Sequence, residues 1–158
     1  MNAAAVIEAL KARGWMLATA ESCTGGMIAA AMTDVAGSSA VFERGFVTYS
    51  NAAKVQMLGV PLVVIETEGA VSEAVAALMA QGALAHSAAD IALSVTGIAG
   101  PGGSEHKPEG RVCFGLATAG HSQTQTIEFG AIGRANVRTR STLHGLAMLH
   151  AAAQDLPA

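Results

Sequence analysis

The chain has 158 residues, of which 51% are apolar and only 4% aromatic, and its formal net charge is −3. This length suits a single domain with a substantial core, and the abundant alanine and glycine favour small-residue helices packed closely on a sheet. The slight acidity argues against binding to nucleic acid or acidic membranes, and neither a membrane span nor an export signal is apparent, so we expect a cytoplasmic protein.

In chain order, the first predicted element is a helix that ends at Gly14. A buried strand follows at 15–20 and leads, through a turn that contains Ser22, into a helix at 25–32. A second strand is predicted at 44–49.

The middle of the chain is predicted to be mainly helical. A short helix spans 51–58, and an alanine-rich helix capped by Ser72 spans 73–87. An apolar, β-rich run at 91–96 is typical of a central strand, and a loop rich in glycine and charge spans 97–110.

The C-terminal part is predicted to form a hairpin of strands at 111–118 and 123–129, followed by a helix at 136–154. The residues expected on the inner side of this helix are Val137, Leu143, Leu146, Ala147 and His150. This order of elements predicts one α/β layered domain, residues 1–158, with a mixed sheet.

Ser22 lies where the first predicted strand turns into a helix. A helix N-terminus presents free N–H groups that suit an anion or a developing oxyanion, so Ser22 is a candidate nucleophile. The alternative is that Ser22 or Thr24 only caps the helix. Cys23 is a second candidate nucleophile, because a thiol at a helix start can be acidified, but no histidine lies near it in the sequence.

Lys54 has small or apolar neighbours and follows the turn after Tyr49. A lysine shielded from water loses part of its preference for the charged form, and it can then act as a base towards a serine. Tyr49 could orient that lysine or donate a proton. The alternatives are a solvated surface lysine and an edge-strand tyrosine whose hydroxyl reaches solvent.

The glycine-rich segment Gly97, Ile98, Ala99, Gly100 follows the predicted central strand and could cradle an anion with its backbone N–H groups, or could be no more than a flexible turn. Ligands of open α/β sheets bind beyond the carboxyl ends of the strands, so this loop and the Ser22 turn are expected to share a cleft. Arg134 and Arg138, four residues apart at the start of the last helix, suggest a phosphate site. The two cysteines and five histidines show no metal-ligand spacing.

Several strings resemble, in order, the C-terminal domain of the competence-damage-inducible protein A family, the nicotinamide-nucleotide amidases. They are Thr19–Gly26 (TAESCTGG), Ala36–Ser39 (AGSS), Phe42–Asn51 (FERGFVTYSN) with Lys54, Gly69–Ser72 (GAVS) and Ser94–Pro101 (SVTGIAGP). The resemblance covers nearly the whole chain. It implies an α/β/α sandwich that converts nicotinamide mononucleotide and water to nicotinic acid mononucleotide and ammonia, with no metal or cofactor, as a cytoplasmic homodimer.

Carried over by position, the resemblance implies Ser22 as nucleophile, Lys54 as its base and Tyr49 close by. The backbone around Cys23, Thr24, Gly25 and Gly26 would then hold the oxyanion, and the Gly97 loop and both arginines would bind ribose and phosphate. Two departures stand out. The loop after Pro101 is one residue shorter than usual, with Glu109 in place of a valine, and the chain has no room for the additional N-terminal domain of many relatives, so we expect the stand-alone form. A non-catalytic nucleotide-binding or regulatory module is the alternative function.

Overall fold

The structure, a computed structural model, describes residues 2–157. Its strands are β1 (Leu17–Glu21), β2 (Phe42–Val47), β3 (Ile91–Gly97), β4 (Arg111–Thr118) and β5 (His121–Glu128). Its helices are α1 (Ala3–Arg13), α2 (Met27–Thr33), α3 (Asn51–Leu58), α4 (Leu62–Glu68), α5 (Glu73–Ala85) and α6 (Arg134–Asp155), with a 3-10 turn at Ser38–Ala40.

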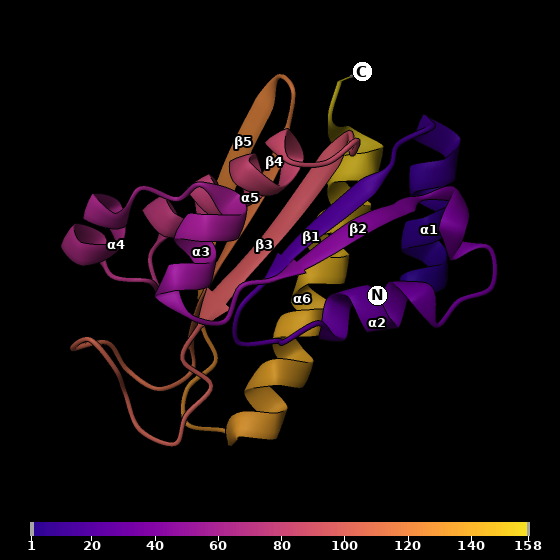
Figure 1. The fold of residues 1–158 in the computed structure, drawn as a ribbon. Coiled ribbons are helices and arrows are strands. Elements are labelled where there is room, and N and C mark those ends of the chain that lie inside the picture. Colours follow the sequence, from indigo (N-terminus) through magenta and orange to yellow (C-terminus); the bar gives the residue numbers. More distant parts are fainter. Residues whose placement is uncertain (1, 158) are drawn as a thin grey trace.

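The five strands form one mixed sheet in the order β2–β1–β3–β4–β5 (Figure 1). Strand β1 runs parallel to both β2 and β3, whereas β4 runs antiparallel to β3 and β5. Helices α1, α2 and α6 cover one face of the sheet, and α3, α4 and α5 cover the other (Figure 1). The predicted mixed-sheet α/β/α sandwich is therefore confirmed.

The two faces of the sheet differ in side-chain size because successive strand residues point to opposite faces. Leu93 packs in the core under α1, α2 and α6, whereas Ala92 faces the core under α5. The small residues allow a close approach: a Cβ on Gly115 would lie 2.3 Å from the carbonyl oxygen of Ala76 in α5. The close helix–sheet packing predicted from the composition is confirmed at this contact.

The parallel strands position the site, because their carboxyl ends lie at the same edge of the sheet. The Ser22 N–H donates to the Val95 carbonyl (2.9 Å), and the Thr48 N–H donates to the Glu21 carbonyl (2.9 Å). The segments that follow β1, β2 and β3 therefore begin side by side. This juxtaposition is the one expected for a shared cleft.

Four details of the sequence prediction are corrected. Helix α4 was not predicted, and β2 ends at Val47, so Tyr49 lies beyond the strand. On α6, Leu143 is 49% exposed and Ala147 is also exposed, so neither lies on the buried face. Within residues 2–157, no helix is both long and apolar enough to cross a membrane.

Candidate active site

Ser22 and Lys54 lie next to each other although they are far apart in the sequence. The Lys54 Nζ atom is 3.1 Å from Ser22 Oγ, and it also lies 3.0 Å from the Thr48 carbonyl oxygen and 3.1 Å from the Tyr49 carbonyl oxygen. Lys54 projects from α3, whose first turn is capped by the Ser50 side chain, and Ser22 directly follows β1. The two side chains are thus held by separate rigid elements at hydrogen-bond distance.

The environment of Lys54 favours an uncharged amine. Lys54 is only 1% exposed, and this burial lowers its pKa from the usual lysine value, an effect that the negative charge of Glu105, and of Cys23 when its thiol is ionised, partly opposes. A neutral amine has two N–H donors and one lone pair. In the structure Lys54 Nζ donates to Ser22 Oγ and to both carbonyl oxygens, and the Ser22 hydroxyl donates to the Tyr49 carbonyl. Carbonyl oxygens can only accept, so in the neutral amine the Ser22 hydroxyl is the one of the three partners that can donate to the lone pair.

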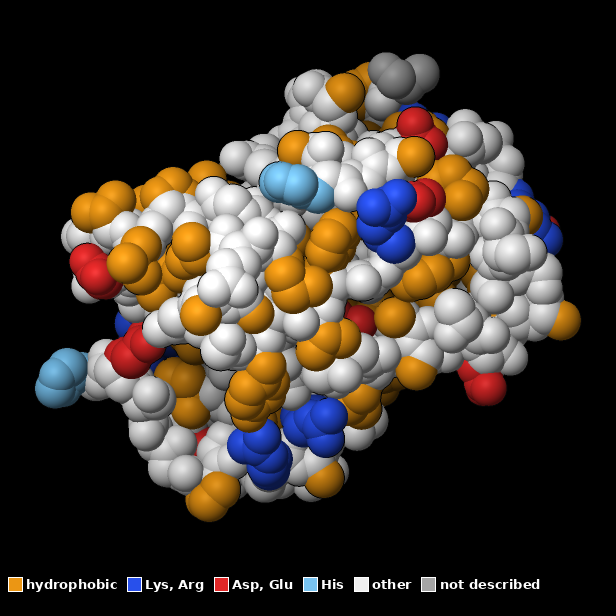
Figure 2. Space-filling model, viewed as in Figure 1, with side chains coloured by type: hydrophobic (Ala, Val, Ile, Leu, Met, Phe, Trp, Pro, Cys, Tyr) orange, Lys and Arg blue, Asp and Glu red, His pale blue; other side chains and the backbone are white. Residues whose placement is uncertain are grey.

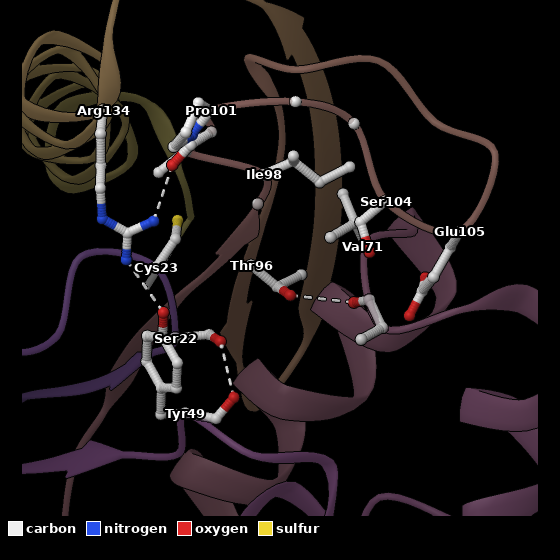
Figure 3. Close-up of a pocket in the computed structure, with 16 residues that line it drawn as sticks. Ser22, Cys23, Tyr49, Val71, Thr96, Ile98, Pro101, Ser104, Glu105 and Arg134 are labelled. Atoms are coloured by element: carbon white, nitrogen blue, oxygen red, sulfur yellow. Dashed lines mark hydrogen bonds between the residues drawn. The ribbon is translucent and has the colours of Figure 1, made fainter.

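The backbone carbonyl and the side-chain hydroxyl of Tyr49 contact different parts of the site. Its carbonyl oxygen lies near Lys54 Nζ and 3.4 Å from Ser22 Oγ. Its side chain, 60% exposed, extends across the pocket to accept a hydrogen bond from Arg134 (3.0 Å; Figure 3). It is therefore the backbone of Tyr49, rather than its hydroxyl, that orients the lysine and the serine.

The turn after Ser22 differs from the predicted helix start. Helix α2 begins at Met27, with Gly26 as its cap residue, so neither Ser22 nor Thr24 caps it. Two N–H groups of α2, those of Ile28 and Ala29, donate instead to the buried carboxylate of Glu21 (2.9 and 3.0 Å). These amides are occupied, and an anion would have to use the turn before the helix.

Glu21 was missed in the sequence analysis. Its carboxylate also accepts a hydrogen bond from the Thr24 hydroxyl (2.7 Å), so it braces both the turn and the helix. The signal was present, because an acidic residue at the end of an otherwise apolar strand needs buried partners.

The backbone amides of Cys23, Thr24 and Gly26 donate to no other residue within 2–157. Of these three residues, Cys23 borders the cleft beside Ser22, so its amide is the one placed to donate to a developing negative charge there. The Cys23 side chain is a poor alternative nucleophile, because burial raises the pKa of its thiol to about 12. Over the same residues, no three His, Cys, Asp or Glu side chains are grouped as metal ligands.

A pocket of about 310 Å³ opens beside Ser22 (Figure 3). The predicted loop residues all line it, namely Gly97, Ile98, Ala99 and Gly100. The Glu109 carboxylate accepts a hydrogen bond from the Gly102 N–H (2.6 Å), which joins the two ends of the loop after Pro101. The predicted shared cleft between the Ser22 turn and this loop is present.

The two arginines of α6 have different positions. Arg134 lines the pocket and donates to the Gly100 carbonyl (2.9 Å). Arg138, one turn later, does not line the pocket; it donates to the carbonyls of Cys23 (3.0 Å) and Thr24 (3.4 Å). Figure 2 shows two basic side chains lying together at the bottom of this face, where α6 begins in Figure 1, apart from the other charged side chains in view.

The family model for the CinA C-terminal domain matches residues 1–153 of the chain. The chain belongs to the CinA C-terminal domain family. Among its relatives, the nicotinamide-nucleotide amidohydrolase PncC of Escherichia coli is 54% identical over 143 residues, which are 90% of this chain and 87% of that protein. A putative competence-damage inducible protein of Symbiobacterium thermophilum is 50% identical over 92% of this chain, which spans only 36% of that longer protein.

Solved structures of CinA-family proteins have the same fold. The competence/damage inducible protein CihA of Agrobacterium tumefaciens has a TM-score of 0.93 and 47% identity, covering 96% of this chain and 93% of its own. The competence damage-inducible protein A of Klebsiella pneumoniae has a TM-score of 0.94 and 40% identity, and the match covers 98% of this chain and 96% of that protein. The family and fold inferred from the sequence are confirmed.

Proposed function

We propose that this CinA-family protein is a nicotinamide-nucleotide amidohydrolase that uses Ser22 as nucleophile and uncharged Lys54 as general base. The observation that carries the proposal is the 3.1 Å contact between Lys54 Nζ and Ser22 Oγ, in a setting where the lysine is 1% exposed. The 54% identity to the Escherichia coli enzyme of that name supports the activity. The substrate is nicotinamide mononucleotide.

In the first half-reaction, the Lys54 lone pair takes the Ser22 hydroxyl proton while Oγ bonds to the carboxamide carbon. The carbonyl electron pair moves to the oxygen, where amides of the Cys23–Gly26 turn donate to it; such a donor is worth about 3 kcal/mol. The oxyanion then collapses, the C–N bond breaks, and the Lys54 ammonium returns its proton to the leaving nitrogen, which departs as ammonia.

In the second half-reaction, water replaces ammonia at the acyl carbon. Lys54 takes a proton from the water as its oxygen attacks, the C–Oγ bond breaks, and the proton passes to Ser22 Oγ. Nicotinic acid mononucleotide leaves, and the dyad returns to its starting state. No step requires a metal or a redox cofactor.

For the remainder of the nucleotide, Arg134 is the proposed phosphate ligand. Its guanidinium group donates a hydrogen bond to the Tyr49 hydroxyl, and the Ser22 hydroxyl donates one to the Tyr49 carbonyl. The length of one tyrosine side chain therefore separates the nucleophile from this cation. The Gly97–Gly100 loop forms the wall between them and is proposed to contact the ribose.

The test is to incubate the purified protein with nicotinamide mononucleotide, with and without a chelator, and to measure ammonia. We expect stoichiometric ammonia and nicotinic acid mononucleotide, unchanged by the chelator. Saturable nucleotide binding without ammonia would support the non-catalytic module instead. The homodimer expected from the sequence stays a prediction, which sedimentation of the purified protein would test.

A further inference from the structure

Arg138 is hydrogen-bonded to the backbone of the turn that follows the nucleophile. Its Nε and one terminal nitrogen donate to two consecutive carbonyl oxygens, those of Cys23 and Thr24. The guanidinium lies against Gly25, where a Cβ would come within 3.4 Å of it. This arginine is committed to backbone acceptors and lies outside the pocket lining, which is not the arrangement of a phosphate ligand.

The contact fixes the direction of one peptide N–H. In a trans peptide the C=O and N–H bonds point in opposite directions, and the bond between Cys23 and Thr24 is trans. Since Arg138 holds the Cys23 carbonyl towards α6, the Thr24 N–H must point away from α6. No other residue within 2–157 accepts from that N–H.

The neighbouring peptide is held in a similar way. The Ser22 carbonyl accepts a hydrogen bond from the Gly25 N–H (3.0 Å), which turns the Cys23 N–H away from Gly25. Glu21 holds the Thr24 side chain through its hydroxyl. Both amides are thus oriented by their surroundings and donate to no other residue within 2–157. Of the two residues, Cys23 lines the pocket beside Ser22, whereas Thr24 is fully buried.

We propose that Arg138 is a positioning residue for the oxyanion site: by holding the Cys23 and Thr24 carbonyls, it fixes the turn in which the Cys23 N–H, at the edge of the pocket, can donate to the oxygen that becomes negative. The inference rests on the proposed amidohydrolase function. It replaces the phosphate-binding role expected for Arg138 from the sequence.

The two roles predict different kinetics, because a phosphate contact is made in the ground state and an oxyanion contact only in the transition state. With nicotinamide mononucleotide as substrate, we expect Arg138→Ala to lower kcat about 10- to 100-fold and to leave KM within about threefold. Arg134→Ala is the contrasting variant, for which a raised KM is expected. Arg140→Ala is the matched control, since Arg140 is exposed on the same helix, and it should retain wild-type kinetics.

The pH dependence separates positioning from a general disturbance of the site. If Arg138 acts only on the oxyanion, the acidic limb of kcat/KM, which Lys54 sets, stays at the same pH in Arg138→Lys, which keeps the positive charge. A raised KM with unchanged kcat would overturn the proposal in favour of phosphate binding. A shifted acidic limb would also overturn it, because the dyad itself would then have moved.

If Arg138→Ala does not fold, Arg138→Lys decides, since lysine keeps the charge but cannot hold two carbonyls in a fixed fork. A kcat loss of at least fivefold at unchanged KM supports the proposal, and a kcat within twofold of wild type overturns it. A wild-type protein that releases no ammonia refutes the proposed function itself. That result is distinct from an active wild type with an unaffected Arg138 variant.

Discussion

Replacing Ser22 by alanine removes one oxygen atom, and the structure gives the cost to stability. Ser22 Oγ has two contacts, with Lys54 Nζ at 3.1 Å and with the Tyr49 carbonyl at 3.4 Å. Lys54 keeps both carbonyl acceptors and the Tyr49 carbonyl keeps the lysine, so no buried group loses its last partner. The free energy of unfolding should fall by about 1 kcal/mol or less, which lowers Tm by about 2–4 °C.

The cost to activity should be far larger. Loss of the nucleophile in a serine hydrolase lowers kcat about a million-fold, so ammonia release by Ser22→Ala should fall to background. The assay is ammonia release from nicotinamide mononucleotide together with a thermal melt. Ser38→Ala is the matched control, because Ser38 and Ser22 are each 8% exposed and Ser38 does not line the pocket. Retention of more than a few per cent of wild-type activity in a folded Ser22→Ala protein would show that Ser22 is not the nucleophile.

Three further predictions concern the lysine and the thiol. Lys54→Met should lower kcat about 100- to 10,000-fold, as measured by ammonia release, because the general base is lost while the volume is kept. In the wild type, kcat/KM should rise with pH through the lowered pKa of Lys54, since only the neutral amine accepts the proton; an acidic limb at the ordinary lysine value of 10.5 would contradict this. Cys23→Ala should keep at least a third of wild-type kcat, because the thiol pKa of about 12 leaves almost no thiolate at neutral pH; loss of activity in a folded variant would indicate a cysteine hydrolase.

The sequence was sufficient to predict the layers of the fold and to single out Ser22 and Lys54, which lie 3.1 Å apart in the structure. Their roles in catalysis stay a prediction. The strand before Ser22 and the strand before Gly97 are short and mainly apolar, and each is followed by small and glycine residues, so their parallel pairing brings both turns to one edge. The small and apolar neighbours of Lys54 made it a candidate base but left a solvated surface lysine open, and it was the family resemblance that favoured the base.

The missed helix α4 has a local cause. It contains Val63, Val64, Ile65 and Thr67, which are β-branched and disfavour helix, and it is only seven residues long. Burial of Ile65 against the α5 side of the sheet decides its conformation. Such a tertiary contact is not visible in the local pattern.

The roles of the two arginines could not be separated from the sequence for a similar reason. Residues four apart share a helix face, so Arg134 and Arg138 looked equivalent. One helical turn nevertheless moves the second arginine from the pocket wall to the backbone of the Ser22 turn. Which acceptor each guanidinium finds depends on how the loop after β3 and the turn after β1 meet α6.

The most direct test of the proposed Ser22–Lys54 mechanism is to detect the acyl group on the protein. Wild-type protein is mixed with nicotinamide mononucleotide, quenched in acid within milliseconds, digested with pepsin and sequenced by mass spectrometry. We expect a nicotinoyl-nucleotide ester on the hydroxyl of Ser22 that is absent from the Lys54→Met protein. An acyl group on Cys23, or a burst of ammonia from protein that carries no acyl group at all, would contradict it.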